Sequence, residues 1–455
     1  LLDDGKPVHE VELKTSNTDT SLVLHIYSRQ PVQALQKTDS RSRFVTFTLV
    51  NRTPAPTRPG DEDCFFQCGI RVAGANDEPC FLEYPERISD GKETPEESSL
   101  SLLYSHRTVF AVGHGCSAEW QENNGDCNEV SSSSLPVHEI PPILPAGLPD
   151  LKLSMRSMSG EDGKATNELC KRLSDGYATW IEEQRRKTAD LPEHLKSAAT
   201  ANLETCDECL RRIQAGASLL SENARARKAF ALMNRAMLMQ HEHYRLSTEG
   251  KRYWEAKGKD LQLAEPYVKP DYDASERTWR PFQLAFVLMS LRSIVLQEEE
   301  DFTERDIVDL IWFPTGGGKT EAYLGLTAFT IFWRRLSNPD NAGTTALMRY
   351  TLRLLTTQQY QRAASLICAC VYLRRGLPDQ LGASAITIGL WVGGGVTPNT
   401  EKAATVALNK VLQGDRENPF IILSCPWCGA QMGPVRQGRK IRAKGYRKLT
   451  GPNRV

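Results

Sequence analysis

Apolar and polar residues alternate with a period of two through the first third of the chain. Clear examples are SLVLHIY at 21–27 and RFVTFTLV at 43–50, and residues that favour turns (Pro, Gly, Asn and Asp) separate such runs. Alternation bounded by turn residues is typical of half-buried β-strands. We therefore predict a β-rich N-terminal domain, a sandwich or a barrel, over residues 1–155.

The hydrophobic period changes to three or four residues between about 160 and 253. It is carried by CKRLSDGYATWIEEQRRK from Cys170, NLETCDECLRRIQAG from Asn202 and ARKAFALMNRAMLMQHEHY from Ala226. This spacing predicts amphipathic helices, so we expect a helical bundle or arm over 156–258. The polar stretch 259–279 contains two prolines and predicts a linker.

Strand-like and helix-like segments alternate from residue 280 onward. The strand-like ones are IVDLIWF, TTALMRY, AITIGLWV and PFIILS, and helical patterns lie before and between them. Such an order predicts a parallel sheet with helices on both faces. The expected fold class is therefore multidomain α/β, with a parallel-sheet domain at 280–455 that follows a β-rich domain and a helical region.

Composition narrows the class of protein. The chain has 455 residues, of which 40% are hydrophobic and 25% charged, and its formal net charge is zero. No global field attracts it to a polyanion, so any contact with nucleic acid must come from local basic clusters. Its twelve cysteines form no repeating framework, it has no apolar run of membrane-spanning length, and its N-terminus lacks a signal-peptide pattern. We expect a cytoplasmic protein with reduced thiols and no membrane association.

A glycine-rich loop stands between a buried-type strand and a helix in WFPTGGGKTEAY, which begins at Trp312. The amides of Gly316, Gly317 and Gly318 can converge on phosphate oxygens because no Cβ intervenes. Lys319 would reach the β- and γ-phosphates, and Thr320 would hold Mg²⁺. The alternative is a strand-to-helix turn with an incidental lysine. Phe313 stands where a P-loop usually has its first glycine.

The segment Pro314-Thr315-Gly316-Gly317-Gly318-Lys319-Thr320-Glu321 resembles motif I of superfamily 2 helicases. That resemblance implies a RecA-like domain that binds ATP and Mg²⁺, with Lys319, Thr320 and Glu321 as its catalytic residues. Upstream, RPFQLAF resembles the Q motif, in which a glutamine reads the adenine edge. The residues assigned to the nucleotide are then Arg280, Phe282, Gln283, Pro314, Thr315, Gly316, Gly317, Gly318, Lys319 and Thr320. A helix-surface glutamine is the alternative for Gln283.

Two downstream segments resemble helicase motifs that contact a nucleic-acid backbone. TLRLLTTQQ matches motif Ia at Arg353, Leu355 and Gln358, and WVGGGVTPNT resembles the GG motif. A tight strand-to-helix turn explains the three glycines equally well. The residues that we assign to DNA contact are Arg349, Tyr350, Arg353, Gln358, Gly394, Gly395 and Thr397.

A Cys-Pro-Trp-Cys unit predicts half of a zinc site. Cys425 and Cys428 have zinc-knuckle spacing, but the other two ligands of a tetrahedral site would have to lie outside this chain. A redox pair is the alternative. A basic stretch follows, with seven Lys or Arg residues between Arg436 and Lys448, which could track a nucleic-acid backbone or form a solvated insertion.

Taken together, these motifs resemble the DrmA family, the helicase-like proteins of DISARM anti-phage systems. The family implies an ATP-dependent DNA helicase or translocase that works with a DrmB-like partner. No acidic box of the D-E-x-H kind follows the motif Ia segment. We therefore expect 280–455 to be an incomplete first RecA-like domain, with the hydrolytic carboxylates outside this chain. A nucleotide-dependent signalling switch and a degenerate P-loop scaffold are the alternatives.

Overall fold

The computed structural model describes residues 8–446 except for a set of short segments: 17–18, 31–41, 55–56, 59, 85–93, 124, 137–146, 149, 250–251, 259, 298–302, 313–316, 351–352, 393–396 and 415–419. The chain divides into two compact units. One comprises 1–141 with 192–199, and the other comprises 142–191 with 200–455.

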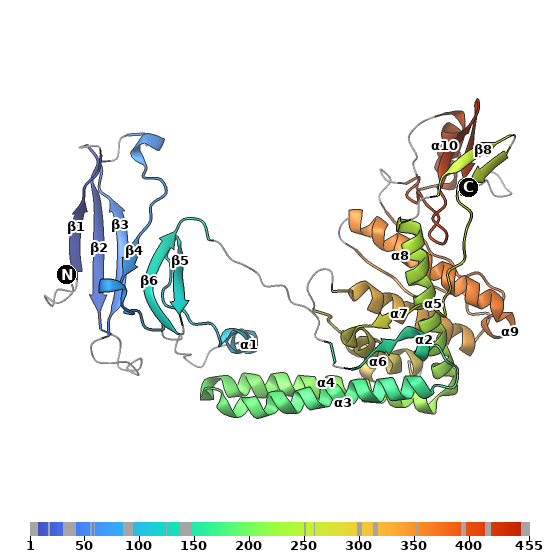
Figure 1. The fold of residues 1–455 in the computed structure, drawn as a ribbon, viewed down its shortest axis with the longest axis horizontal. Helices are drawn as coiled ribbons and strands as arrows, with labels where there is room; N and C mark the ends of the chain where they lie inside the picture. The colour runs from blue at the N-terminus through green and yellow to red at the C-terminus, as the bar shows by residue number, and fades with distance from the viewer. Residues whose placement is uncertain are drawn as a thin grey trace. The chain divides into compact units, whose positions relative to one another are not determined.

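Two antiparallel three-stranded sheets form the first unit (Figure 1). One has the order β1-β2-β3, with β1 at Val8–Leu13, β2 at Leu22–Arg29 and β3 at Phe44–Asn51. The other has the order β4-β6-β5, with β4 at Arg71–Ala73, β5 at Ser117–Asn123 and β6 at Asp126–Ser133. Helix α1 spans Pro95–Tyr104, and two short 3-10 turns lie at Asp61–Asp63 and Ala75–Asp77. The strands predicted at 21–27 and 43–50 are confirmed as β2 and β3.

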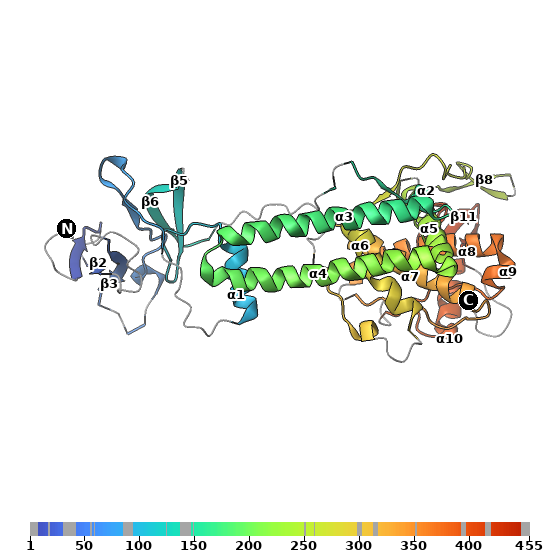
Figure 2. The ribbon, with the colours of Figure 1, turned by 90° about the horizontal axis from the view of Figure 1, so that it is seen from below.

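Helix α3, at Lys164–Lys187, and most of α4, at Glu193–Glu222, form a helical hairpin in the second unit. A 3-10 turn at Thr188–Asp190 follows α3. Figures 1 and 2 show the two helices running antiparallel and side by side. An ion pair of 2.7 Å between Arg185 Nη2 and Asp207 Oδ2 joins them. The helical patterns of the sequence predict both helices because each keeps one apolar stripe.

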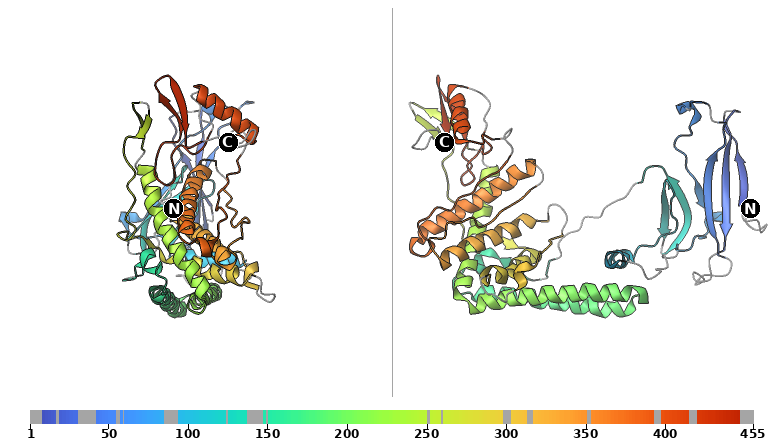
Figure 3. Two further views of the ribbon diagram at one scale, coloured as in Figure 1. Left: turned by 90° about the vertical axis from the view of Figure 1, so that its right-hand side faces the viewer. Right: turned by 180° about the vertical axis from the view of Figure 1, so that it is seen from behind.

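Helix α5, at Ala224–Glu249, lies at the centre of the second unit (Figures 1 and 3). Most of its middle is apolar, and Phe230, Met233, Met237 and Leu238 are fully buried. A helix with so broad an apolar surface must be covered by other elements. The enclosing helices are α2 at Met155–Met158, α7 at Lys319–Ser337 and α8 at Arg353–Gly376.

The remaining elements of this unit are short helices and two-stranded ladders. Helix α6 at Pro281–Val295 packs on α7, and α9 at Pro378–Leu381 packs on α7 and α8. A 3-10 turn spans Thr303–Asp306, and α10 spans Glu401–Gln413. The antiparallel ladders pair β7 (Leu153–Ser154) with β10 (Thr278–Trp279), β8 (Trp254–Lys257) with β9 (Asp260–Leu263), and β11 (Gly433–Gln437) with β12 (Lys440–Lys444). The stretch predicted as a linker thus contains β9 and β10.

The parallel sheet stays a prediction. Every named sheet in the described part of the chain is antiparallel, and the segments 307–312, 344–350 and 385–392 have no assigned strand there. Residues 384–392 nevertheless alternate between half-buried and exposed at every position, which is the period of an extended strand. Ile386 and Ile388 pack against the helical core. On the opposite side Trp391 is 99% exposed, as expected for a strand-like segment whose second face is uncovered.

None of the helices that the structure describes is both long enough and apolar enough to span a membrane.

Candidate nucleotide site

The glycine loop leads directly into α7. Gly317 and Gly318 are described, whereas Phe313, Pro314, Thr315 and Gly316 lie outside the described residues. Gly318 has φ +90° and is the N-cap of α7, which begins at Lys319 and has no side-chain cap among the described residues. The first amides of a helix point along its axis at the positive end of its dipole. An uncapped start of a 19-residue helix can therefore receive an anion such as a phosphate group.

Two side chains from the start of α6 hold the loop. Arg280 Nη1 donates a hydrogen bond of 2.5 Å to the Gly317 carbonyl, and Gln283 Nε2 donates one of 2.7 Å to the Gly318 carbonyl. Gln283 is 4% exposed, and its Oε1 accepts a bond of 2.8 Å from the Arg280 amide. Both ends of the Gln283 amide are therefore engaged by main chain. In this arrangement Gln283 holds the glycine loop, and adenine recognition by it stays a prediction.

Glycine is favoured at position 318 by its positive φ, and a larger residue would also displace the Gln283 side chain. A Cβ built there would lie 2.6 Å from Gln283 Nε2 and 3.4 Å from Glu321 Oε2. Contacts as short as the first are not tolerated between real atoms, and a positive φ already disfavours other residues. The side chains around Gly318 thus form a close-fitting polar cradle for the loop backbone.

Glu321, in the first turn of α7, forms a partly buried ion pair with Arg362 of α8. The two side chains are only 14% and 23% exposed. The Arg362 guanidinium also lies over the ring of Tyr244 from α5, 5.6 Å from its centroid. Burial lowers the pKa of Arg362. Sequence reasoning did not single out Arg362, although it is the only charged residue between Arg353 and Arg374 and so interrupts an uncharged stretch of the helix.

The candidate DNA contacts are distributed over two segments. Arg349 and Tyr350 are exposed just before α8, and Gln358 is exposed on α8 itself. Arg353 is the first residue of α8, but its side chain lies outside the described set, as do Gly394 and Gly395. Thr397 is half-buried before α10. Of the later basic stretch, the β11–β12 hairpin exposes Arg436, Arg439, Lys440 and Arg442.

The Cys-Pro-Trp-Cys turn is anchored on α5 and on the chain that follows it. Arg252 Nε donates to the Cys428 carbonyl at 2.8 Å, and the His243 ring stacks on Trp427 with centroids 3.4 Å apart. A hydrogen bond from the Cys425 thiol, an amide and the Arg252 charge lower the pKa of Cys428 to about 6 against the cost of burial. The same pairing raises the pKa of Cys425.

Within the described ranges, no third His, Cys, Asp or Glu joins Cys425 and Cys428 in a metal-binding group. Tetrahedral zinc needs four ligands. The donors described here therefore do not complete a zinc site, and zinc binding stays a prediction.

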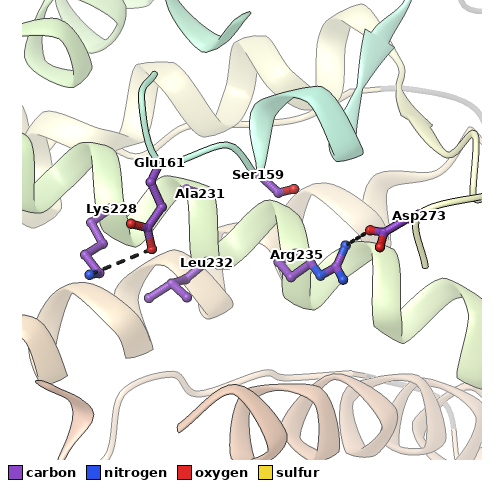
Figure 4. A pocket seen from close by; sticks show the side chains of 7 residues that line it. All are labelled: Ser159, Glu161, Lys228, Ala231, Leu232, Arg235 and Asp273. Atoms are coloured by element: carbon purple, nitrogen blue, oxygen red, sulfur yellow. Dashed lines mark hydrogen bonds and ion pairs between the residues drawn. The ribbon is translucent and has the colours of Figure 1, made fainter. Parts of the chain in front are cut away.

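A polar cavity of about 320 Å³ lies away from the glycine loop, between α5 and the chain around Ser159 (Figure 4). Its four charged side chains form two pairs, Lys228 with Glu161 at 3.9 Å and Arg235 with Asp273 at 3.0 Å. Because each charge is already compensated, the cavity has no net field that would select a charged ligand.

Comparison with known proteins finds a similar protein. It is 33% identical over 412 residues, 85% of its length, to the DISARM protein DrmA of Bacillus paralicheniformis. The chain is DrmA-like. This DrmA-like chain spans about a third (34%) of the length of that relative. No protein-family model matches the chain.

Proposed function

We propose that this DrmA-like chain is the nucleotide-binding part of an ATP-dependent DNA helicase or translocase in a DISARM phage-defence system. The observation that carries the proposal is the uncapped N-terminus of α7, which directly follows a glycine loop held by Arg280 and Gln283. Homology to a DISARM protein supports the biological setting. A DrmB-like protein is the proposed partner.

The residues around the loop fit a nucleoside triphosphate with Mg²⁺. The loop carbonyls of Gly317 and Gly318 are tied back to Arg280 and Gln283, and this leaves the first amides of α7 directed at the phosphate position. Lys319 would hold the β- and γ-phosphates and Thr320 the metal ion. Hydrolysis of the bound nucleotide supplies the free energy for movement. The water-activating carboxylates are proposed to lie outside this chain.

DNA would be held beside the loop by the chain before α8 and by α8 itself. Arg349, Tyr350 and Gln358 are exposed and could reach phosphate or sugar groups. The proposal assigns Arg353, Gly394, Gly395 and Thr397 to the same strand. A change in the loop on nucleotide binding would then move these contacts relative to the DNA.

Nucleotide turnover with and without single-stranded DNA separates this function from its alternatives. A helicase-like motor shows ATP hydrolysis that DNA stimulates, a signalling switch binds ATP without DNA stimulation, and a degenerate scaffold binds no nucleotide. Lys319→Ala should abolish ATP binding or turnover, because it removes the cation at the phosphates. Lys402→Ala, which removes an exposed lysine at the start of α10, is the matched control. Undiminished nucleotide binding in Lys319→Ala would contradict the proposed site.

A further inference from the structure

A partly buried ion pair joins α7 to α8. The proposed function assigns the nucleotide to α7 and DNA to α8. Glu321 is the third residue of α7 and follows the glycine loop, and its amide donates to the Gly318 carbonyl at 3.2 Å. Arg362 is on α8, 41 residues later, and its Nη2 donates to Glu321 Oε1. Residues four apart share a helix face, so the exposed Gln358 lies one turn from Arg362 on α8.

The carboxylate of Glu321 lies beside the loop that is proposed to bind phosphate, where its negative charge opposes that binding. Its second oxygen, Oε2, is buried without a partner among the described residues and lies 3.4 Å from the Cβ position of Gly318. A negative charge at that point repels a triphosphate held by the same turn, because low-dielectric surroundings screen charge poorly. Only a cation placed against the carboxylate removes that repulsion.

Arg362 is held in place by more than Glu321. Its guanidinium lies over the Tyr244 ring, so α5, α7 and α8 meet at this side chain. A displacement of α8 must therefore either carry the first turn of α7 with it or separate this partly buried ion pair. Separation leaves two poorly solvated charges without their partners, which is unfavourable.

We propose that Arg362 is a positioning residue that neutralises Glu321 beside the phosphate loop and thereby couples nucleotide binding on α7 to DNA binding on α8. This inference rests on the proposed function and adds a coupling between its nucleotide site and its DNA site. Linkage is reciprocal, so DNA should change the affinity for MgATP by the same factor by which MgATP changes the affinity for DNA.

The test measures the affinity for a fluorescent ATP analogue with Mg²⁺, with and without a single-stranded oligonucleotide. Arg362→Met keeps an unbranched apolar stem and removes the charged guanidinium. It should weaken nucleotide binding by about tenfold and abolish the DNA-dependent change in that affinity. Arg362→Lys keeps the charge and should retain most of the affinity. Arg375→Met, an exposed position on the same helix, is the matched control.

The double variant Glu321→Gln/Arg362→Met separates positioning from a merely structural role. Removing the uncompensated carboxylate should restore most of the nucleotide affinity but not the linkage to DNA. If Arg362→Met loses its helical circular dichroism, Glu321→Gln alone carries the test. It should tighten nucleotide binding by about threefold and still weaken the linkage.

Two negative results have different meanings. A wild-type chain that binds MgATP with DNA linkage, together with Arg362→Met that keeps both, overturns this inference and leaves the proposed function standing. Additive effects of the two substitutions on nucleotide affinity also overturn it, since a pair that acts together is not additive. A wild-type chain that binds no MgATP overturns the proposed function and the inference with it.

Discussion

Arg212 of α4 and Asp309 are 97 residues apart and form a bidentate ion pair, with Nη1–Oδ1 at 2.6 Å and Nη2–Oδ2 at 2.8 Å. Nη2 of Arg212 also donates to the Met289 carbonyl of α6 at 3.3 Å. Asp309 stands four residues before Phe313 in the segment that leads to the glycine loop. The helical hairpin is therefore fixed at its base to both elements that position the loop.

We expect Arg212→Ala to lower the free energy of unfolding by about 3 to 5 kcal/mol, because the Arg212 side chain is almost fully buried and Asp309 would lose its partner. Urea denaturation followed by circular dichroism measures the loss. Lys171→Ala removes one partner of an exposed ion pair on α3 and should leave the midpoint almost unchanged. Equal effects of the two substitutions would show that the Arg212 pair is solvated.

Gly216 allows α4 to approach the backbone of α6, which gives a second test of the same junction. A Cβ at Gly216 would lie 2.1 Å from the Leu288 carbonyl oxygen. Ala is a better helix former than Gly by about 1 kcal/mol, but the collision is with backbone and cannot be relieved by a side-chain rotation. Gly216→Ala should therefore reduce the free energy of unfolding by about 1 to 3 kcal/mol.

Gly376→Ala, at the end of α8, is the matched control for Gly216→Ala. A Cβ there meets no atom within 4 Å, so the substitution should cause no loss of stability. Thermal unfolding of both variants distinguishes a collision from a general effect of alanine. A stabilised Gly216→Ala would contradict the close approach of α4 and α6.

The sequence predicts most of the helices of the second unit because their apolar residues recur every three or four positions. The helix expected after the glycine loop, for example, is present as α7 at Lys319–Ser337. The same reasoning missed β5 and β6, where polar residues such as Glu119, Glu122 and Asn123 obscure the alternation. A half-exposed strand of a small sheet needs few apolar residues, so hydrophobic periodicity identifies it poorly.

Only part of the candidate site can be predicted from the sequence, because its contacts join distant parts of the chain. Motif spacing identifies the glycine loop and Gln283, and the structure brings Gln283 to Gly318. The sequence gives no indication that Gln283 bonds the loop carbonyl, or that Glu321 faces Arg362. Such contacts depend on how helices far apart in the chain pack against each other, and local pattern does not encode that packing.

Stability should fall as the pH falls below neutrality, because of His241 on α5. Burial, with the nearby charges of Arg277 and Arg362, lowers the pKa of His241 to about 4. An unfolded histidine has a pKa of about 6.5, so between these values the unfolded chain binds a proton that the folded chain does not. The stabilisation is complete above about pH 6.5 and is lost as the pH falls toward 4, by about 3 kcal/mol at most.

His241→Gln should flatten this dependence, measured as the urea midpoint between about pH 7 and pH 5. His243 has its pKa shifted in the same direction by burial, so part of the slope will persist. His106→Gln, at an exposed position, should leave the slope unchanged. An unaltered slope in His241→Gln would show that folding does not lower the pKa of this ring.

Cys428 should be the most reactive thiol of the Cys-Pro-Trp-Cys turn at neutral pH. Its pKa of about 6 makes it a thiolate there, whereas the pKa of Cys425 is raised. Iodoacetamide should therefore alkylate Cys428 first, with a rate that rises through about pH 6, and peptide mass spectrometry identifies the modified site. Arg252→Gln removes a neighbouring positive charge, so the rise in labelling rate should move to higher pH. Added Zn²⁺ that protects both cysteines would favour a metal site over a redox pair, because a bound thiolate is withdrawn from alkylation. Faster labelling of Cys425 would contradict the assignment of the thiolate.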